Sequence, residues 1–321
     1  MKSQENLRAV IDIGTVTTRV LAVKRTDSGF EQLLKNAIIT QLGEGLLDSG
    51  VLSQEAIGRV AETVDGYIEE LAKVGIDVSK NDSDNPLVVA MATSAARDAS
   101  NSQDLVDELS KRNIPLAVIS GNEEATLSFA GATCDFRGDG ILVSDIGGGS
   151  TELIYGSAHE DGSATISKRH SFNVGCRRVT DMFLADDPPT KSQLEEAAAW
   201  SRAQISEFFD GLGKVIRFIG VAGTSTSLVS MEKHMEVYDS SKVHGAIITR
   251  EQVVDSMNEL ASMDLESRKH VVGLQPGRAG VMVAGTIILN EVMQLAGVEE
   301  MTVSENDNMM GLIMKMFCQG K

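Results

Sequence analysis

Hydrophobic and polar positions follow two different periods along the chain, and short segments of one period alternate with segments of the other. Apolar residues run nearly unbroken through Ala9–Ile13 and Leu87–Ala92, which is typical of buried strands. From Ile57 to Leu71 apolar residues recur every three or four positions, which predicts an amphipathic helix with Ser53 as its N-cap. This alternation predicts an α/β protein with largely buried sheets.

Similar patterns predict further elements. They are the strands Thr17–Lys24, Leu116–Ile119 and Val215–Val221 and the helix Gln103–Arg112. Two more helices are predicted to begin with a capping box, in which the first and fourth residues bond each other's backbone N–H groups. Ser192 and Glu195 are expected to form one box, and Thr249 and Gln252 the other.

Two segments of the chain align with each other without a gap. VIDIGTVTTRVL (Val10–Leu21) matches VSDIGGGSTELI (Val143–Ile154). The matched pairs are Asp12 with Asp145, Gly14 with Gly147, Thr17 with Ser150, and Arg19 with Glu152. Each copy is predicted to be a strand, a turn of small residues and a return strand. A repeat at the start of each half of a 321-residue chain predicts a duplicated domain, with the two halves facing each other across a cleft.

Composition excludes several classes of function. The net charge of −17 argues against non-specific nucleic-acid binding, so a phosphate-rich ligand would need a local basic pocket or a bound cation. The longest apolar stretch, near Val281–Leu289, is too short to span a membrane, and the N-terminus shows no secretory signal. Three scattered cysteines without a CxxC motif favour reduced thiols in a cytoplasmic protein.

The second copy of the repeat carries candidate chemistry. The N–H groups of Gly147, Gly148 and Gly149 can turn inward as an anion-binding nest, and hydroxyl donors follow directly. Asp145 and Glu152 flank the turn. Because Mg²⁺ takes one or two carboxylates together with substrate phosphate oxygens, this pair is a candidate magnesium site.

Three other segments each allow two interpretations. Ala222–Ser227, which contains Gly223 and Thr224, is a second phosphate-binding candidate at a helix N-terminus or an ordinary strand–helix turn. Arg97 is either a planar hydrogen-bond donor to phosphate or an ordinary surface arginine. Glu123 and Glu124 are reactive carboxylates or simply acidic residues favoured at a helix start. His244 is a weaker candidate for a residue of the site. The sequence contains no P-loop, GxSxG or HExxH motif.

Together these segments resemble the exopolyphosphatase and guanosine-pentaphosphate phosphohydrolase family, within the acetate-kinase, sugar-kinase and actin superfamily. The resemblance rests on DIGTVTTRV, ATSAARD, ISGNEEA, DIGGGSTEL, NVGCRRV, GVAGTSTS, PGRAGVMVAG and VSENDNMMG. It implies two ribonuclease-H-like (actin/acetate-kinase-like) domains with a central cleft. Domain I would comprise residues 1–122 and 305–321, with the last helix, Glu305–Phe317, packing back on it, and domain II residues 123–304.

The resemblance also implies roles for the matched residues. Glu124 is expected to be the general base that activates water, Arg97 to contact phosphate, and Asp145 and Glu152 to hold Mg²⁺ or another divalent cation, with K⁺ left open. The expected phosphate-binding residues are Asp12, Gly14, Thr15, Thr17, Gly147, Gly148, Ser150, Gly223 and Thr224. Arg177, Arg178 and Arg278 are expected to form a basic wall.

We therefore expect a cytoplasmic phosphohydrolase that releases terminal orthophosphate from inorganic polyphosphate, short chains preferred, because the helical C-terminal domains of longer relatives are missing. Guanosine pentaphosphate is the alternative substrate. A catalytically weak polyphosphate sensor is a second alternative, suggested by Val16 in place of the family's usual asparagine and Met309 near the position of its usual arginine. Family members are often dimers, so a homodimer is expected, without a nucleic-acid or membrane partner.

Overall fold

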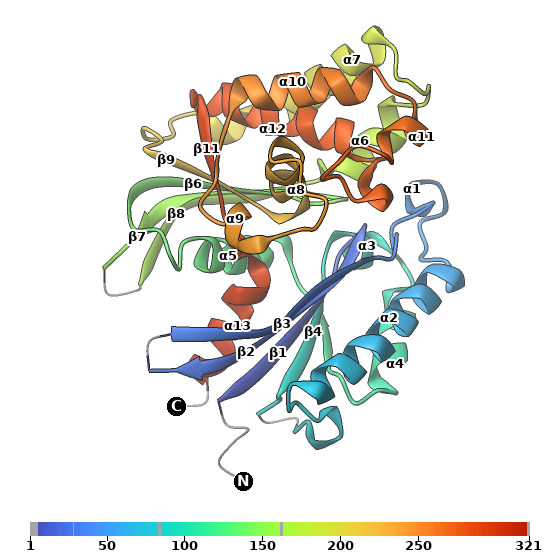
Figure 1. The fold of residues 1–321 in the computed structure, drawn as a ribbon, viewed down its shortest axis with the longest axis vertical. Coiled ribbons are helices and arrows are strands. Elements are labelled where there is room, and N and C mark those ends of the chain that lie inside the picture. The colour runs from blue at the N-terminus through green and yellow to red at the C-terminus, as the bar shows by residue number, and fades with distance from the viewer. Residues whose placement is uncertain (1–5, 28, 83–84, 161–162, 320–321) are drawn as a thin grey trace. The chain divides into compact units, whose positions relative to one another are not determined.

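The computed structural model describes residues 6–27, 29–82, 85–160 and 163–319. It divides into two compact units, of which unit 1 comprises Met1–Glu124 and Met309–Lys321, and unit 2 comprises Ala125–Asn308 (Figure 1). The expected domain boundaries after residues 122 and 304 lie two and four residues before the observed ones after Glu124 and Asn308. Residues 1–5, on which the expected lack of a secretory signal partly rests, lie outside the described residues.

Unit 1 is built on a five-stranded sheet of order β3-β2-β1-β4-β5. Its strands are β1 (Leu7–Ile13), β2 (Thr17–Thr26), β3 (Gly29–Ile39), β4 (Val88–Ala92) and β5 (Leu116–Val118). Its helices are α1 (Leu46–Ser49), α2 (Gln54–Lys73), η1 (Val78–Lys80), α3 (Ser94–Asp98), α4 (Ser102–Ser110) and α13 (Asn308–Gln319). β1, β2 and β3 pair antiparallel, whereas β4 is parallel to both β1 and β5.

Unit 2 is built on a six-stranded sheet of order β10-β11-β9-β6-β7-β8. Its strands are β6 (Gly138–Ile146), β7 (Thr151–Ala158), β8 (Ala164–Phe172), β9 (Arg217–Val221), β10 (Ile247–Thr249) and β11 (Glu300–Val303). Its helices are α6 (Cys176–Phe183), α7 (Lys191–Ile205), η2 (Ser206–Phe209), α8 (Ala222–Glu232), α9 (Ser240–Val243), α10 (Arg250–Ala261), α11 (Leu265–Arg268), η3 (Pro276–Arg278) and α12 (Met282–Ala296). Helix α5 (Gly121–Ala132) begins in unit 1 and continues into unit 2.

The two sheets repeat each other strand for strand. The order β8-β7-β6-β9-β11 in unit 2 corresponds to β3-β2-β1-β4-β5 in unit 1, with the same parallel and antiparallel pairings, and β10 is an addition. The register is also repeated, because Asp12 lies opposite Arg19 and Asp145 lies opposite Glu152. The duplication predicted from the sequence is therefore present in the backbone.

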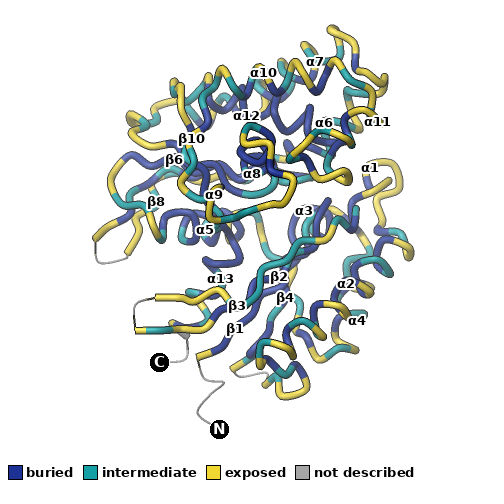
Figure 2. Tube along the Cα trace, in the orientation of Figure 1, coloured by how far each residue is buried: buried dark blue, intermediate teal, exposed yellow. Residues whose placement is uncertain are grey.

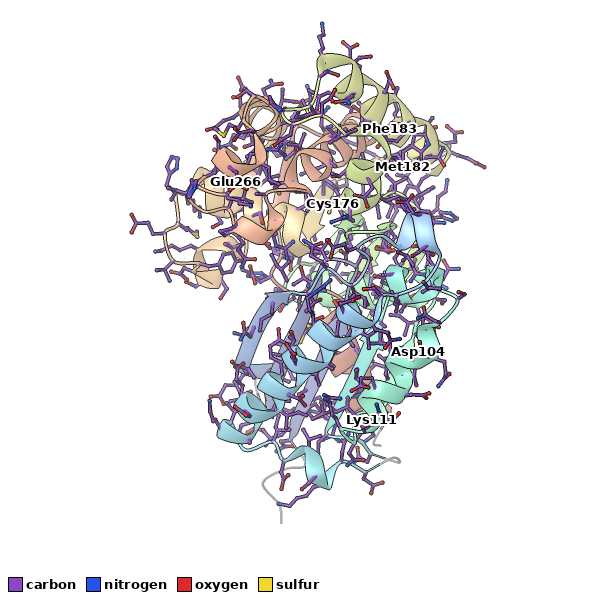
Figure 3. The ribbon with its side chains drawn as sticks, turned by 90° about the vertical axis from the view of Figure 1, so that its right-hand side faces the viewer. Asp104, Lys111, Cys176, Met182, Phe183 and Glu266 are labelled. Atoms are coloured by element: carbon purple, nitrogen blue, oxygen red, sulfur yellow. The ribbon has the colours of Figure 1, made fainter. Side chains whose placement is uncertain are left out.

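Apolar residues of the central strands and of one helix face fill each core (Figure 2). In unit 1, α2 begins at the predicted N-cap Ser53 and buries Ile57, Val60, Val64 and Leu71 against the sheet. Figure 3 labels two solvent-exposed residues of this region, Asp104 in the first turn of α4 and Lys111 directly after the helix. In unit 2, the apolar stretch near Val281–Leu289 forms most of α12, which is buried along its length. Within the described ranges, no helix is long and apolar enough to cross a membrane.

The predicted strands and the helix Gln103–Arg112 begin and end within two residues of the observed elements, and the capping box of Thr249 and Gln252 is confirmed. The predicted box of Ser192 and Glu195 is wrong. Thr190 caps α7 instead, since its backbone is extended and it exchanges hydrogen bonds with Gln193. The two possible boxes, Thr190 with Gln193 and Ser192 with Glu195, begin two residues apart in the sequence. The helix starts with the Thr190 box because Thr190 directly follows Pro189 and is not yet helical.

The last helix also begins later than predicted, at Asn308 instead of Glu305. The N–H of Glu305 donates to His244 Nδ1 (3.2 Å), and the N–H of Asn306 donates to Ser304 Oγ (3.1 Å). These bonds hold the segment in a turn before the helix starts. The Phe317 ring of α13 packs against Phe30, with ring centroids 5.6 Å apart, inside unit 1.

A buried hydrogen bond fastens α2 to the return strand of the first turn. Tyr67 Oη donates to the carbonyl oxygen of Thr18 at 2.8 Å. We expect Tyr67→Phe to lower the free energy of unfolding by about 1 kcal/mol, because the carbonyl loses a partner that water cannot easily replace. Urea midpoints will measure the loss. Tyr155→Phe is the matched control, since its exposed bond to Lys214 is replaceable by water; equal losses in both variants would contradict the prediction.

Candidate active site

The two matched turns close in the same way. The N–H of Gly14 donates to the carbonyl of Thr17 at 3.0 Å, and the N–H of Gly147 donates to the carbonyl of Ser150 at 2.9 Å. The expectation that the Gly147 N–H turns inward toward an anion is therefore wrong, because this N–H closes the turn. A Cβ at Gly14 would lie 3.1 Å from the Thr17 carbonyl oxygen, and one at Gly147 would lie 3.3 Å from that of Ser150. The glycines therefore allow each strand to end in a tight turn one residue after its aspartate.

In unit 1 the aspartate before the turn is paired with an arginine. Arg19 Nε donates to Asp12 Oδ2 at 3.0 Å, and its Nη2 also bonds that oxygen. The carboxylate is buried, and the guanidinium balances its charge. The sequence reading used Arg19 only to align the repeat and missed this role, although its position opposite Asp12 follows from the predicted hairpin. The expected contact of Asp12 with phosphate stays a prediction.

The other residues of the first turn are largely enclosed. Thr15 and Thr17 are buried, and their contact with phosphate also stays a prediction. Val16 is buried, and its carbonyl accepts hydrogen bonds from the N–H groups of Thr40 and Gln41 (3.0 and 2.9 Å). These two backbone bonds anchor the turn to the chain directly after β3.

The two neighbouring glutamates at the start of α5 have different roles. Glu123 forms a capping box with Ser120, whose N–H and Oγ donate to Glu123 Oε2 at 3.0 and 2.9 Å, while Ser120 Oγ accepts from the N–H of Glu123. These bonds lower the pKa of the exposed Glu123 carboxyl. The S-x-x-E pattern of Ser120 and Glu123 was the sequence signal that could have identified this cap.

Glu124 is instead buried and ion-paired. Its side chain, 8% exposed, accepts a hydrogen bond from Arg97 Nη1 at 2.9 Å, and the same nitrogen lies 3.2 Å from the carbonyl oxygen of Ile119. The sequence named both Glu124 and Arg97 as site residues, and the structure brings them together. Arg97 contacts the carboxylate, whereas its expected contact with phosphate stays a prediction.

In unit 2 the corresponding position holds two carboxylates. Asp145 and Glu152 lie directly opposite each other on β6 and β7, and are 5% and 1% exposed. Two like charges at such a pair destabilise a sheet unless something balances them. A hydroxyl contacts each: Ser128 Oγ donates to Asp145 Oδ2 at 2.8 Å, and Ser171 Oγ donates to Glu152 Oε1 at 2.5 Å. The sequence reading missed both serines, which lie outside its motifs.

This donor set fits a magnesium ion. No cluster of three or more His, Cys, Asp or Glu side chains suited to a metal occurs in the described part of the chain. Magnesium does not need one, because it commonly takes one or two carboxylates and completes its octahedron with water and phosphate oxygens. The buried, facing pair of Asp145 and Glu152 supplies those two carboxylates.

The turn of unit 2 that contains Gly147, Gly148 and Gly149, called the glycine turn below, is hydrogen-bonded to α6. The first residue of this helix, Cys176, is labelled in Figure 3. The carbonyl of Gly147 accepts a hydrogen bond from the N–H of Cys176 at 2.9 Å. The carbonyl of Gly148 accepts one from the N–H of Arg177 at 2.8 Å. Arg178 Nε donates to the carbonyl of Gly149 at 3.0 Å. All three glycine carbonyls are thus directed at the start of α6.

The segment from Ala222 to Ser227 forms the first turns of α8, not a separate loop. Ala222 has φ 60°, a left-handed conformation that costs a non-glycine residue roughly 1–3 kcal/mol and is often found at functional sites. Thr224 Oγ1 lies 3.3 Å from the carbonyl oxygen of Ile146, directly before the glycine turn. The two predicted phosphate-binding segments of unit 2 are therefore in contact.

Arg278 lies against the second of these segments. A Cβ built at Gly223 would be 1.7 Å from Arg278 Nη1, so only glycine admits the guanidinium there. Of the other two arginines of the expected basic wall, Arg178 contacts the glycine turn and Arg177 pairs with Asp181 at 2.8 Å. Burial raises the pKa of the nearby Cys176 thiol to about 11, so this cysteine is no thiolate nucleophile at neutral pH.

His244, the weaker candidate, belongs to a structural cluster. Its Nδ1 accepts a hydrogen bond from the N–H of Glu305. The centroid of its ring lies 5.4 Å from that of Phe136, and its Nε2 is 3.6 Å from Asp135 Oδ2. The described contacts of this histidine therefore join the turn after α5 to the segment before α13.

Comparison with known proteins places this arrangement in a family. The model of the Ppx/GppA phosphatase family matches residues 21–318. The chain belongs to the Ppx/GppA phosphatase family. Membership confirms the predicted phosphohydrolase, and the paired sheets confirm the predicted class of an α/β protein with two ribonuclease-H-like units.

Similar members of this family span different lengths. A bifunctional 3-dehydroquinate synthase/phosphatase of Fusobacterium nucleatum is 34% identical over 321 residues, which cover 96% of this chain and 46% of that protein. Exopolyphosphatase 2 of Mycobacterium tuberculosis is 29% identical over 328 residues, which cover 96% of this chain and 98% of that protein. The chain thus spans about half of the first relative and nearly all of the second.

A solved structure of an exopolyphosphatase agrees in fold. The crystal structure of an exopolyphosphatase from Cytophaga hutchinsonii matches with a TM-score of 0.85 at 25% identity, covering 97% of this chain and 98% of that one. The agreement extends over both units, so the duplicated sheets described above are a property that this chain shares with a solved exopolyphosphatase.

Proposed function

We propose that this phosphatase releases terminal orthophosphate from inorganic polyphosphate by metal-assisted, in-line attack of water. The observation that carries the proposal is the buried pair of facing carboxylates, Asp145 and Glu152, directly beside the glycine turn. Phosphoryl transfer depends on positioning and charge neutralisation more than on covalent chemistry, and this site would supply both once it holds a cation. The similarity to proteins named exopolyphosphatase supports polyphosphate as the substrate.

Asp145 and Glu152 would hold Mg²⁺ in this proposal. Bound there, the ion would neutralise negative charge on the phosphate oxygens as the reaction proceeds. Two buried carboxylates facing each other would bind it more firmly than a single exposed one, because they otherwise repel each other in a poorly solvated place.

The glycine turn would bind the phosphate itself. In a planar trans peptide the C=O of one residue and the N–H of the next point in opposite directions. Since the carbonyls of Gly147, Gly148 and Gly149 are directed at α6, the N–H groups of residues 148–150 are turned away from that helix. In this proposal they would receive the anion, and the guanidinium of Arg278, which lies against Gly223, would add a positive charge.

Glu124 would activate the water. Its buried carboxylate is held by Arg97, and four residues further along α5 lies Ser128, which contacts Asp145. Residues four apart share one face of a helix, about one turn from each other, so Glu124 and Ser128 lie on one face of α5. Glu124 takes a proton from water as the new O–P bond forms, and the bridging P–O bond breaks to release the shortened chain.

The decisive experiment is phosphate release from polyphosphates of defined length. We expect Mg²⁺-dependent release that EDTA abolishes, with higher kcat/KM on short chains, because the net charge of −17 repels each phosphate beyond the local pocket. The same residues would act on guanosine pentaphosphate, so kcat/KM on both substrates separates these alternatives. Binding without turnover would instead favour the sensor, which is the outcome that contradicts the proposal. A K⁺ requirement stays a prediction, which activity assays with Na⁺ in place of K⁺ will test. A homodimer also stays a prediction, which light scattering will test.

One variant tests the second phosphate segment. In Gly223→Ala the new Cβ would displace the flexible end of Arg278, so we expect KM for polyphosphate to rise about tenfold through the lost charge-assisted contact. Steady-state kinetics will measure the change. Gly66→Ala is the matched control, since a Cβ at that helical glycine meets no atom within 4 Å. An unchanged KM in Gly223→Ala would remove Arg278 and this segment from the phosphate site.

A further inference from the structure

Two serines outside all of the motifs described above contact the two candidate metal ligands. We propose that Ser128 and Ser171 are positioning residues for the divalent cation, each holding one carboxylate of the Asp145 and Glu152 pair in the orientation that the ion requires. The inference rests on the proposed function, in which those two carboxylates bind the metal. The serines themselves contact the carboxylates and not the ion.

Ser171 is placed by the pairing of the strands. Asp145 on β6 lies opposite Glu152 on β7, and Glu152 lies opposite Ser171 on β8, so the three residues form one row across the sheet. Directly opposite side chains in antiparallel strands have Cβ atoms about 5 Å apart, which is the reach of a serine–carboxylate hydrogen bond. The Ser171 Oγ to Glu152 Oε1 distance of 2.5 Å agrees with such a direct contact.

Ser128 is placed by a helix. It is fully buried on α5, and its Oγ donates to Asp145 Oδ2 at 2.8 Å. Because water has no access to this hydroxyl, loss of the bond would leave the carboxylate oxygen without a ready substitute. The same helix carries Glu124 one turn earlier, so the contact also fixes α5 relative to Asp145.

The internal repeat provides a natural comparison. The corresponding row in unit 1 is Asp12 on β1, Arg19 on β2 and Ala37 on β3. Where an arginine takes the place of the second carboxylate, the serine is replaced by an alanine that has no donor. The hydroxyl in unit 2 therefore accompanies the carboxylate pair, as expected if its purpose is to orient Glu152.

A hydroxyl suits this role because it carries no charge. A guanidinium or ammonium would fix a carboxylate equally well but would cancel the charge that attracts the cation, as Arg19 does at Asp12. A neutral donor fixes the orientation and leaves the charge. Partners of this kind behind metal ligands typically contribute 10- to 100-fold in metal affinity.

Direct titration of the metal-free protein with Mn²⁺, followed by electron paramagnetic resonance, tests the assignment without relying on turnover. We expect Ser128→Ala and Ser171→Ala each to weaken Mn²⁺ binding by about 10- to 100-fold. Ser144→Ala is the matched control, because Ser144 is buried on β6 beside Asp145 and its hydroxyl has no hydrogen-bond partner among the described residues. Its Mn²⁺ affinity is expected to equal that of the wild type.

A conservative variant separates orientation from folding. Ser171→Thr keeps the hydroxyl and suits a strand, so it should retain most of the Mn²⁺ affinity that Ser171→Ala loses. This pair decides the question even if Ser128→Ala fails to fold. If wild type binds Mn²⁺ and the alanine variants bind it as tightly as Ser144→Ala does, the positioning assignment is wrong and the proposed function stands. If the wild-type protein binds no Mn²⁺, the metal chemistry of the proposed function fails, and the inference fails with it.

Discussion

Replacement of Glu124 by glutamine is expected to lower kcat for phosphate release from polyphosphate by about 10²–10⁴-fold, the usual contribution of a positioned general base. Glutamine keeps the shape of the side chain and can still accept a hydrogen bond from Arg97, but it cannot take a proton from water. KM should change little, because the phosphate-binding groups are untouched. Steady-state kinetics on a short polyphosphate will measure both constants.

The adjacent glutamate offers a matched control. Glu123→Gln makes the same chemical change one residue earlier, on a side chain that caps α5 and is exposed to solvent. Glutamine also serves in a capping box, so this variant should keep the wild-type kcat. The assignment of Glu124 as the base fails if its glutamine variant retains most of the rate, or if both variants lose activity equally.

Replacement of Asp145 by asparagine should have the second large effect, lowering kcat/KM by about 10²–10³-fold and removing the response to Mg²⁺. Losing a carboxylate ligand removes several kcal/mol of charge stabilisation, and about 1.4 kcal/mol corresponds to a tenfold change in rate. The metal-free variant should melt at a Tm no lower than that of the wild type, because the repulsion between Asp145 and Glu152 is relieved.

Thermal melting with and without Mg²⁺ tests this without measuring catalysis. Mg²⁺ should raise the Tm of the wild type, since it binds only the folded protein, and should leave that of Asp145→Asn unchanged. Asp139→Asn on the same strand is the control, because its side chain is exposed and its Mg²⁺ response should be that of the wild type. An equal Mg²⁺ response in Asp145→Asn and wild type would rule out Asp145 as a ligand.

Local patterns predicted those features that depend on neighbours in the chain. The strand before each Asp-Ile-Gly turn, the N-cap Ser53 and the box of Thr249 and Gln252 follow from periodicity and from backbone groups a few residues apart. Where two local signals compete, as Thr190 and Ser192 do, the sequence reading chose the wrong one. The two patterns differ too little in local energy for sequence reasoning to rank them.

Contacts between distant segments explain most of what the sequence reading missed. Ser128 and Ser171 are 17 and 19 residues away from the carboxylates that they contact, and Arg278 reaches Gly223 from another part of the chain. Single serines and arginines are common, so none of them stands out in the sequence. The different roles of Glu123 and Glu124 likewise became visible only through burial and through the position of Arg97.

The sequence by itself determined that this chain is an α/β protein with an internal duplication, and that an aspartate and a glycine end the first strand of each copy. Those features arise from hydrophobic periodicity and from the backbone freedom of glycine, which are local properties. Only the tertiary structure decided how the charges are balanced, with an arginine opposite Asp12 and a second carboxylate opposite Asp145, and a hydroxyl beside each carboxylate of that pair. Strand pairing and helix packing bring those groups together, and no local pattern specifies which side chains will meet.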